Sequence, residues 1–183
     1  MIEGKLTVIT GCMFAGKTNT LIDLVGKEKY RKRDLICFKP AQDNRYSTTQ
    51  IVSHNQIALD ALVVKTASDI EEVLQTKEAI KTSVAIEEGQ FFDPSIAPLV
   101  STLSNDGFRI FVAGLALDSF GHPFGPMPEL LAYADEIIQL HAQCVICTKD
   151  ATRTFRKIKT QEQVHVGGAD DYEPMCKKCW REN

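Results

Sequence analysis

An octapeptide near the start of the chain, residues 11–18, has the spacing G-x-x-x-x-G-K-[ST] that is typical of a phosphate-binding loop. It directly follows an apolar run and opens a helical pattern, which is the context that this motif requires. Glycines let backbone N–H groups curl toward phosphate oxygens, and a helix N-terminus adds partial positive charge. We therefore predict that the loop binds ATP, with the Lys17 amine near the β- and γ-phosphates and the Thr18 hydroxyl on Mg²⁺. The predicted nucleotide-binding residues of the loop are Gly11, Cys12, Met13, Phe14, Ala15, Gly16, Lys17 and Thr18.

Two adjacent carboxylates, Glu87 and Glu88, follow the apolar run 83–86. Ligands of open α/β sheets bind at the carboxyl ends of strands, where this pair would lie. Neighbouring side chains of an extended segment point in opposite directions, so one carboxylate can face Mg²⁺ while the other faces an acceptor. We assign Glu87 to the metal side and Glu88 to the catalytic base that accepts the proton of the attacking hydroxyl. The alternative is two solvated glutamates in a turn, but Phe91 beside them favours a pocket.

Four of the six cysteines form two C-x₂-C pairs, Cys144 with Cys147 and Cys176 with Cys179. Four thiolates in two such pairs suit tetrahedral Zn²⁺, with Zn–S bonds of about 2.3 Å. We predict a structural zinc ion held by all four. Cys37, like Cys12, is expected to be a buried small side chain.

The composition is that of a folded protein with a net charge of -3 and no dominant block of one sign. We therefore expect no nucleic-acid partner, and the basic run 29–33 is interpreted as a solvated helix end. The N-terminus lacks the apolar core of a signal peptide, and no apolar run approaches the ~18 residues that span a bilayer. These features predict a cytoplasmic protein without a membrane partner, where thiols ligate metal rather than form disulfides.

Alternating strand and helix patterns predict an α/β fold with a P-loop, RecA-like parallel sheet and helices on both faces. Helices are expected from Thr18 to about Lys32, from a capping box at residues 68–71 to about Lys81, and from Asp93-Pro94 to near Gly107. The expected strands are mostly continuous apolar runs, as in sheets buried on both faces. They are Leu6–Thr10, Leu35–Lys39, Val84–Glu87, Ile110–Ala113 and Glu136–Leu140.

The pattern changes after about residue 141, which divides the chain into a nucleotide-binding domain, residues 1–141, and a small zinc-binding domain, residues 142–183. Alternation in 152–158 and 163–166 predicts a hairpin between the two cysteine pairs. A unit of this size needs a bound metal ion for stability, because it buries little apolar surface by itself.

The whole set of motifs resembles the thymidine kinases of the cellular and bacterial type, which carry a zinc-bound lasso domain. Nearly the entire chain takes part in the resemblance. Besides the phosphate loop and both cysteine pairs, it includes segments 38–40, 43–46, 53–54, 87–92, 113–115, 123–125 and 167–168, with Tyr172.

The resemblance implies transfer of the ATP γ-phosphate to the 5′-hydroxyl of thymidine, giving dTMP, with Glu88 at the position of the family's base. Gln90, in the same segment, is counted with the nucleotide-binding residues. Segment Val164–Tyr172 matches the lasso that closes over the nucleoside. The resemblance also implies a homotetramer, and it raises deoxyuridine as a second substrate and dTTP as a feedback inhibitor. The implied nucleoside contacts are Met13, Phe91, Leu115, Phe124, Thr154, Val164, Val166, Gly167 and Tyr172.

The chain departs from the family pattern at several positions. Glu87 stands where the family has Asp, and Cys12 stands where it has Pro. Segment 118–122 lacks the arginine that the family's loop often carries. Either Arg45 or Arg156 supplies positive charge to the transferred phosphate, or no arginine does and turnover is lower.

Two other functions remain open at this point. One is a P-loop ATPase whose zinc ribbon binds nucleic acid, and the other is a non-catalytic nucleotide sensor. The negative net charge and the lack of an aromatic and basic stripe oppose the first.

Overall fold

The computed structural model describes residues 4–42, 50–52, 58–158, 162–165 and 167–183. Segments 43–46 and 53–54 of the resemblance, and with them Arg45, lie outside these residues, as does Val166. No helix in the described ranges is long and apolar enough to cross a membrane.

A six-stranded sheet forms the centre of the molecule, with every neighbouring pair of strands parallel. The strand order is β5-β2-β6-β7-β1-β8. In the register, Val112 of β7 lies beside both Val8 of β1 and Ile86 of β6, so the loops after these three strands leave the sheet at one edge. The strands are β1 (Lys5–Gly11), β2 (Asp34–Pro40), β5 (Leu62–Val64), β6 (Thr82–Ile86), β7 (Arg109–Gly114) and β8 (Glu136–Leu140).

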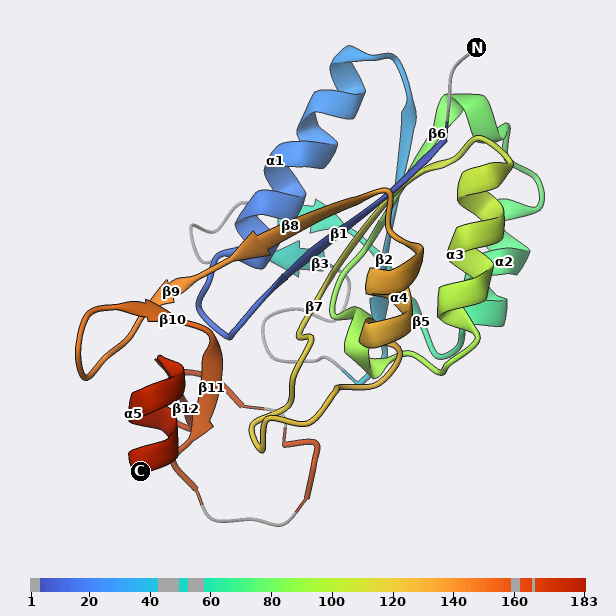
Figure 1. Cartoon of the computed structure of the whole chain (residues 1–183). Helices are drawn as coiled ribbons and strands as arrows, with labels where there is room; N and C mark the ends of the chain where they lie inside the picture. Colours follow the sequence, from blue (N-terminus) through green and yellow to red (C-terminus); the bar gives the residue numbers. More distant parts are fainter. Residues whose placement is uncertain (1–3, 43–49, 53–57, 159–161, 166) are drawn as a thin grey trace.

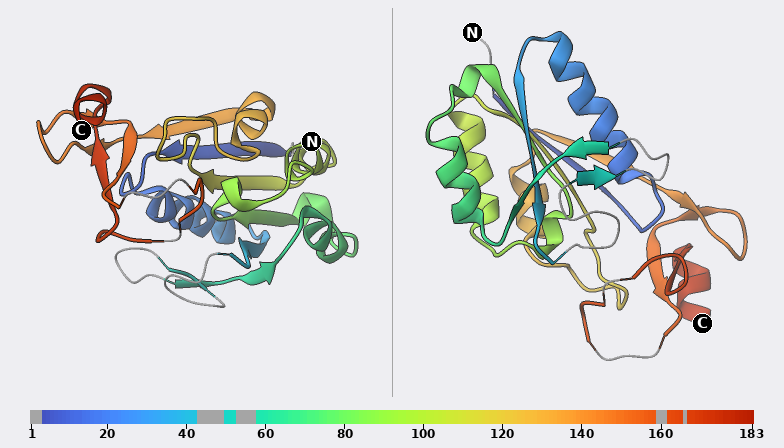
Figure 2. Two further views of the ribbon diagram at one scale, coloured as in Figure 1. Left: turned by 90° about the horizontal axis from the view of Figure 1, so that it is seen from below. Right: turned by 180° about the vertical axis from the view of Figure 1, so that it is seen from behind.

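Helices cover both faces of this sheet (Figures 1 and 2). Helix α1 (Lys17–Tyr30) packs on one face with the short strands β3 (Gln50–Val52) and β4 (Ala58–Asp60), where Ile9, Ala85 and Phe111 are buried. The opposite face buries Val8, Ile86 and Ile110 beneath three helices. These helices are α2 (Ala67–Leu74), α3 (Ile96–Asn105) and α4 (Met127–Tyr133). The predicted parallel α/β fold is therefore confirmed, with the central strands β1, β6 and β7 buried on both faces and the edge strands β5 and β8 partly exposed.

Helix α2 begins and ends earlier than predicted. Its capping box pairs Thr66 with Asp69 rather than Ser68 with Glu71, because the extended backbone of Thr66 lets its side chain accept from the Asp69 N–H. The helix ends at Leu74, and Ala79–Lys81 forms only a 3₁₀ turn. The carbonyl oxygens of Ala79 and Ile80 accept hydrogen bonds of 3.0 and 2.6 Å from the Arg33 guanidinium, which holds this turn out of a continuous helix.

The interpretation of residues 29–33 as a solvated helix end is wrong for Arg33, which is only 7% exposed. Arg33 lies 3.8 Å from the carboxylate of Glu28, which is itself 1% exposed. Arg109 and Ser83 contact the same carboxylate at 3.2 and 3.0 Å. Because Ser83 and Arg109 pair at the start of β6 and β7, this buried charge cluster lies at the amino ends of the strands, away from the phosphate loop.

A smaller unit follows β8 (Figure 1) and packs against Cys12 and Ala15 of the phosphate loop. It contains β9 (Ala142–Gln143), β10 (Asp150–Ala151), β11 (Arg153–Arg156), β12 (Tyr172–Met175) and α5 (Lys177–Glu182). The predicted hairpin is wrong in its second strand, because β11 pairs antiparallel with β12 and not with residues 163–165. The backbone of 163–165 is held instead by side chains described below.

Candidate active site

The phosphate loop connects β1 to α1, as predicted. Gly16 has φ +85°, a left-handed conformation that glycine adopts without steric cost, and it directly precedes the first residue of α1, Lys17. Phe14 also has a positive φ of 67°. The Lys17 amine donates a 2.9 Å hydrogen bond back across the loop to the Cys12 carbonyl. The loop is thus curled as a phosphate cradle requires.

A cavity of about 460 Å³ lies between this loop, the carboxyl ends of β6 and β7, and the C-terminal unit. Of the described loop residues, Gly11, Cys12 and Ala15 do not line it. All the other predicted site residues that the structure describes do, apart from the cysteines of the metal cluster. They are Met13, Phe14, Gly16, Lys17, Thr18, Glu87, Glu88, Gln90, Phe91, Leu115, Phe124, Thr154, Val164, Gly167 and Tyr172.

Glu87 and Glu88 differ in burial and in their contacts at the end of β6. Glu87 is 6% exposed and accepts a 2.6 Å hydrogen bond from the hydroxyl of Thr18. Glu88 is half-buried and has left-handed backbone angles, φ 51° and ψ 48°. The strand ends at Ile86, so a turn separates the two carboxylates rather than the extended segment that the sequence predicted.

Gln90 connects the carboxyl ends of two strands. Its side chain is almost fully buried and donates through Nε2 to the Glu88 carboxylate at 2.5 Å. Its Oε1 accepts a 2.9 Å hydrogen bond from the backbone N–H of Leu115, which follows β7. Gln90 lies on the 3₁₀ turn Gly89–Phe91, and its contacts orient Glu88, a role that the sequence analysis did not assign to it.

Aromatic side chains form the wall opposite the loop. Phe91 and Phe124 pack edge to face, with ring centroids 5.7 Å apart. The chain after Phe124 can approach this turn because residue 125 is glycine, where a Cβ would lie 2.2 Å from the Gln90 carbonyl oxygen. Phe92 is buried in the core. The pair provides an apolar corner of two perpendicular rings, and a planar ring can stack on the face of one of them.

Arg156 contacts the chain at both ends of the lasso segment, Val164–Tyr172. The guanidinium of Arg156 lies between the rings of Phe120 and Tyr172, 5.3 and 5.6 Å from their centroids. It donates to the backbone carbonyls of residues 162 and 163 at 2.6 and 2.9 Å. Arg156 lines the cavity, but its two terminal nitrogens bind the chain leading into the lasso rather than pointing to a phosphate.

Asp118, Gln163 and Lys39 also line the cavity, and the sequence analysis did not assign them to the site. The Asp118 carboxylate is buried and accepts a 2.9 Å hydrogen bond from the Gln163 amide, joining the loop after β7 to the C-terminal unit. Lys39 is 2% exposed at the end of β2. In the sequence, Lys39 and Asp118 could have been noticed as charged residues that lie within an apolar strand or a few positions after one. The side chain of His122 is exposed.

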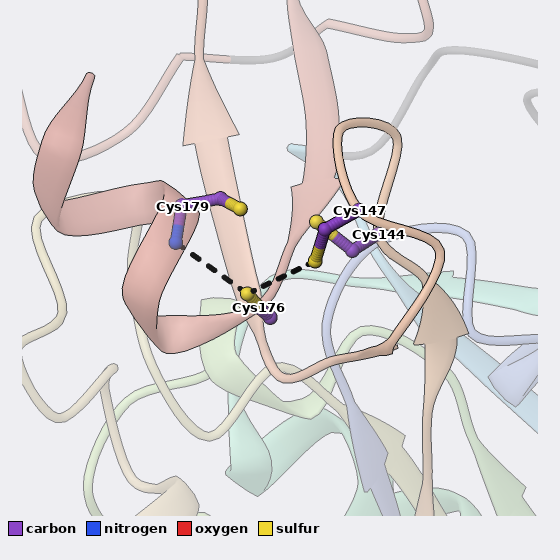
Figure 3. A group of neighbouring side chains, drawn as sticks. All are labelled: Cys144, Cys147, Cys176 and Cys179. Atoms are coloured by element: carbon purple, nitrogen blue, oxygen red, sulfur yellow. Dashed lines mark hydrogen bonds between the residues drawn. The ribbon is translucent and has the colours of Figure 1, made fainter.

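The four cysteines of the two pairs converge in the C-terminal unit (Figure 3). Their sulfur atoms all lie within 4.8 Å of one another, and Cys147 and Cys176 are 3.6 Å apart. A tetrahedral ion with bonds of about 2.3 Å requires sulfurs about 3.8 Å apart, so the cluster is compatible with zinc. Backbone N–H groups, that of Cys176 first, lower the pKa of the Cys144 thiol to about 6, which favours the thiolate that a metal binds.

The parallel sheet and the curled loop between β1 and α1 define a P-loop nucleotide-binding fold. Two solved structures share it, both of the genome packaging NTPase B204 from Sulfolobus turreted icosahedral virus 2, one in complex with ATP-gammaS and one with sulfate. Each has a TM-score of 0.51 and covers 78% of this chain, at 17% and 18% sequence identity and 77% and 76% of the neighbour. At this identity the likeness concerns the fold alone.

Sequence comparison identifies the family. The family model described as thymidine kinase matches residues 4–180. A thymidine kinase of Bacteroides thetaiotaomicron is 40% identical over 178 residues, which is 97% of this chain and 87% of that protein. Its counterpart in Bacteroides fragilis is 39% identical over 179 residues, 98% of this chain and 88% of the relative. The chain belongs to the thymidine kinase family.

Proposed function

We propose that the protein is an ATP:thymidine 5′-phosphotransferase, which moves the γ-phosphate of ATP to the 5′-hydroxyl of thymidine and yields dTMP. The observation that carries the proposal is a single cavity lined by the phosphate loop, by the acidic residues after β6 and by the Phe91–Phe124 pair. A triphosphate on the loop and a nucleoside on the aromatic wall would therefore meet beside Glu88.

Positioning and charge account for most of phosphoryl transfer. Glu88 accepts the proton of the attacking hydroxyl, and Gln90 holds its carboxylate in place. The amines of Lys17 and Lys39 both line the cavity and bring positive charge toward the phosphates. Mg²⁺ supplies further charge on the phosphate oxygens when bound, and the oxygens of Thr18 and Glu87, 2.6 Å apart, are donors of the kind it prefers.

Recognition of the nucleoside rests on both parts of the chain. Phe91, Phe124, Leu115 and Met13 offer apolar contact to the base, and Thr154 lines the same cavity. Tyr172 donates a 2.6 Å hydrogen bond to the His165 carbonyl and so shapes the lasso, whose Val164 and Gly167 face the cavity. Backbone groups of a lasso held in this way would select a base by polar pairing.

Further assignments follow from the sequence pattern and from the family resemblance. We infer a nucleotide-binding domain of residues 1–141 and a zinc domain of residues 142–183, in a cytoplasmic homotetramer. The zinc ion is structural, because its four sulfur ligands leave no open coordination position. Deoxyuridine is proposed as a second acceptor and dTTP as a feedback inhibitor.

Incubating the protein with Mg-ATP and each nucleoside in turn tests the activity directly. Thymidine should be converted to its monophosphate, whereas ADP without a nucleotide product would indicate an ATPase, and no turnover would indicate a sensor. Glu88→Gln should retain ATP binding and lower kcat by about 10²-fold, within the range of general base catalysis. Full activity in this variant would contradict the assignment of the base.

A further inference from the structure

The C-terminal unit makes two hydrogen bonds with the first half of the phosphate loop. The backbone N–H of Met13 donates to the Thr154 hydroxyl at 3.1 Å. The thiol of Cys12 donates to the Ala151 carbonyl at 3.3 Å. Both loop residues come directly before the left-handed Phe14, so these bonds hold the loop at the point where it begins to curl.

Apolar packing reinforces the same junction. Cys12 is 5% exposed and belongs to one buried cluster with Ala151, Met175, Cys144 and Cys179. The metal-ligating cysteines therefore pack directly against the phosphate loop.

We propose that Thr154 is a positioning residue for the phosphate loop, through which the zinc domain supports ATP binding as well as closing over the acceptor. This inference rests on the proposed function for its ligands. The cradle depends on the direction of successive backbone N–H groups, so the loop must be fixed on the side away from the phosphates. The Thr154 hydroxyl fixes it by accepting from Met13, while the same residue is 5% exposed and lines the nucleoside end of the cavity.

A consequence is that the two substrates influence each other. A nucleoside that orders Thr154 also orders the loop, and by linkage ATP strengthens nucleoside binding by the same factor. The residue thus joins the base pocket to the phosphate site through one side chain.

The test compares Thr154→Val, which keeps the shape but removes the acceptor, with Thr154→Ser, which keeps the hydroxyl. Thr152→Val is the matched control, because the Thr152 hydroxyl accepts a hydrogen bond from its neighbour Arg153 rather than from the phosphate loop. Calorimetry measures the affinity for Mg-ATPγS without nucleoside. We expect about tenfold weaker binding for Thr154→Val and values within about twofold of the native protein for the other two.

Zinc content and the thermal unfolding temperature are measured for each variant. A folded, zinc-loaded Thr154→Val that binds Mg-ATPγS like the native protein would overturn the inference, and so would a Thr154→Ser as weak as Thr154→Val. If Thr154→Val does not fold, amide hydrogen exchange of the native protein decides: the Met13 N–H should be protected, and exchange at the rate of an open loop overturns the inference. Nucleotide binding that responds to Thr154→Val in a chain inactive on thymidine would support the inference and refute the proposed function.

Discussion

Replacing Gln90 by leucine should separate the orientation of the base from the binding of ATP. The substitution removes the 2.5 Å hydrogen bond to Glu88 and the 2.9 Å hydrogen bond from the Leu115 N–H. Losing the acceptor of a buried N–H costs about 1–3 kcal/mol, and a hydrogen bond to a charged group contributes about 1.5–3 kcal/mol. The first value should appear in the free energy of unfolding and the second in the activation free energy.

At about 1.4 kcal/mol per factor of ten, the second value corresponds to a kcat lower by about 10- to 100-fold. The KM for ATP should change little, since the Gln90 side chain forms hydrogen bonds with Glu88 and Leu115 rather than with the phosphate loop. Gln90→Glu is the companion variant, because it keeps an acceptor for Leu115 while replacing the donor by a second carboxylate. Two like charges favour a bound proton, so the acid limb of its pH–rate profile should move to higher pH.

Steady-state kinetics with ATP and thymidine varied separately, together with urea unfolding, measure both effects. A folded Gln90→Leu with a kcat close to that of the native protein would refute the orienting role. An effect confined to the KM for ATP would instead restore the nucleotide contact that the sequence analysis assigned to Gln90.

Two further variants test parts of the molecule distant from the base. Glu28→Gln leaves the buried Arg33 without its counter-charge and should lower the free energy of unfolding by about 3 kcal/mol. The kcat should not change, because the charge cluster lies at the amino ends of the strands. Unaltered stability in urea would contradict the ion pair. Cys176→Ser should reduce the zinc content from about one equivalent and lower the unfolding temperature, and full zinc occupancy in elemental analysis would show that this thiolate is not a ligand.

The main strands could be predicted because each is a short run rich in apolar residues, and in β1, β6 and β7 these residues are buried on both faces of the sheet. Strand β5 escaped prediction since it is short and lies at the sheet edge, where Leu62 and Val63 are nearly half exposed. The start of α2 was ambiguous locally, because two capping boxes begin within three residues of each other. Packing decided between them, since Ala67, Ile70 and Leu74 must face the core.

Some parts of the candidate site could likewise be predicted from the sequence, and others could not. The loop, the acidic pair and the cysteine pairs were evident because each lies within a few consecutive residues, or repeats a short spacing. The partner of β11 was not, because alternation indicates a strand without indicating which strand pairs with it. The convergence of the cysteines and the docking of Tyr172 select β12.

By itself, the sequence determined which phosphate-binding, acidic and metal-binding residues are present and which strand each of them follows. Only the tertiary structure decided that Gln90 bridges Glu88 to Leu115, and that Thr154 supports Met13. Those hydrogen bonds depend on the register of parallel strands and on the docking of the C-terminal unit. The first contact joins residues that are 25 positions apart in the sequence, and the second joins residues that are 141 positions apart. No local periodicity encodes such contacts.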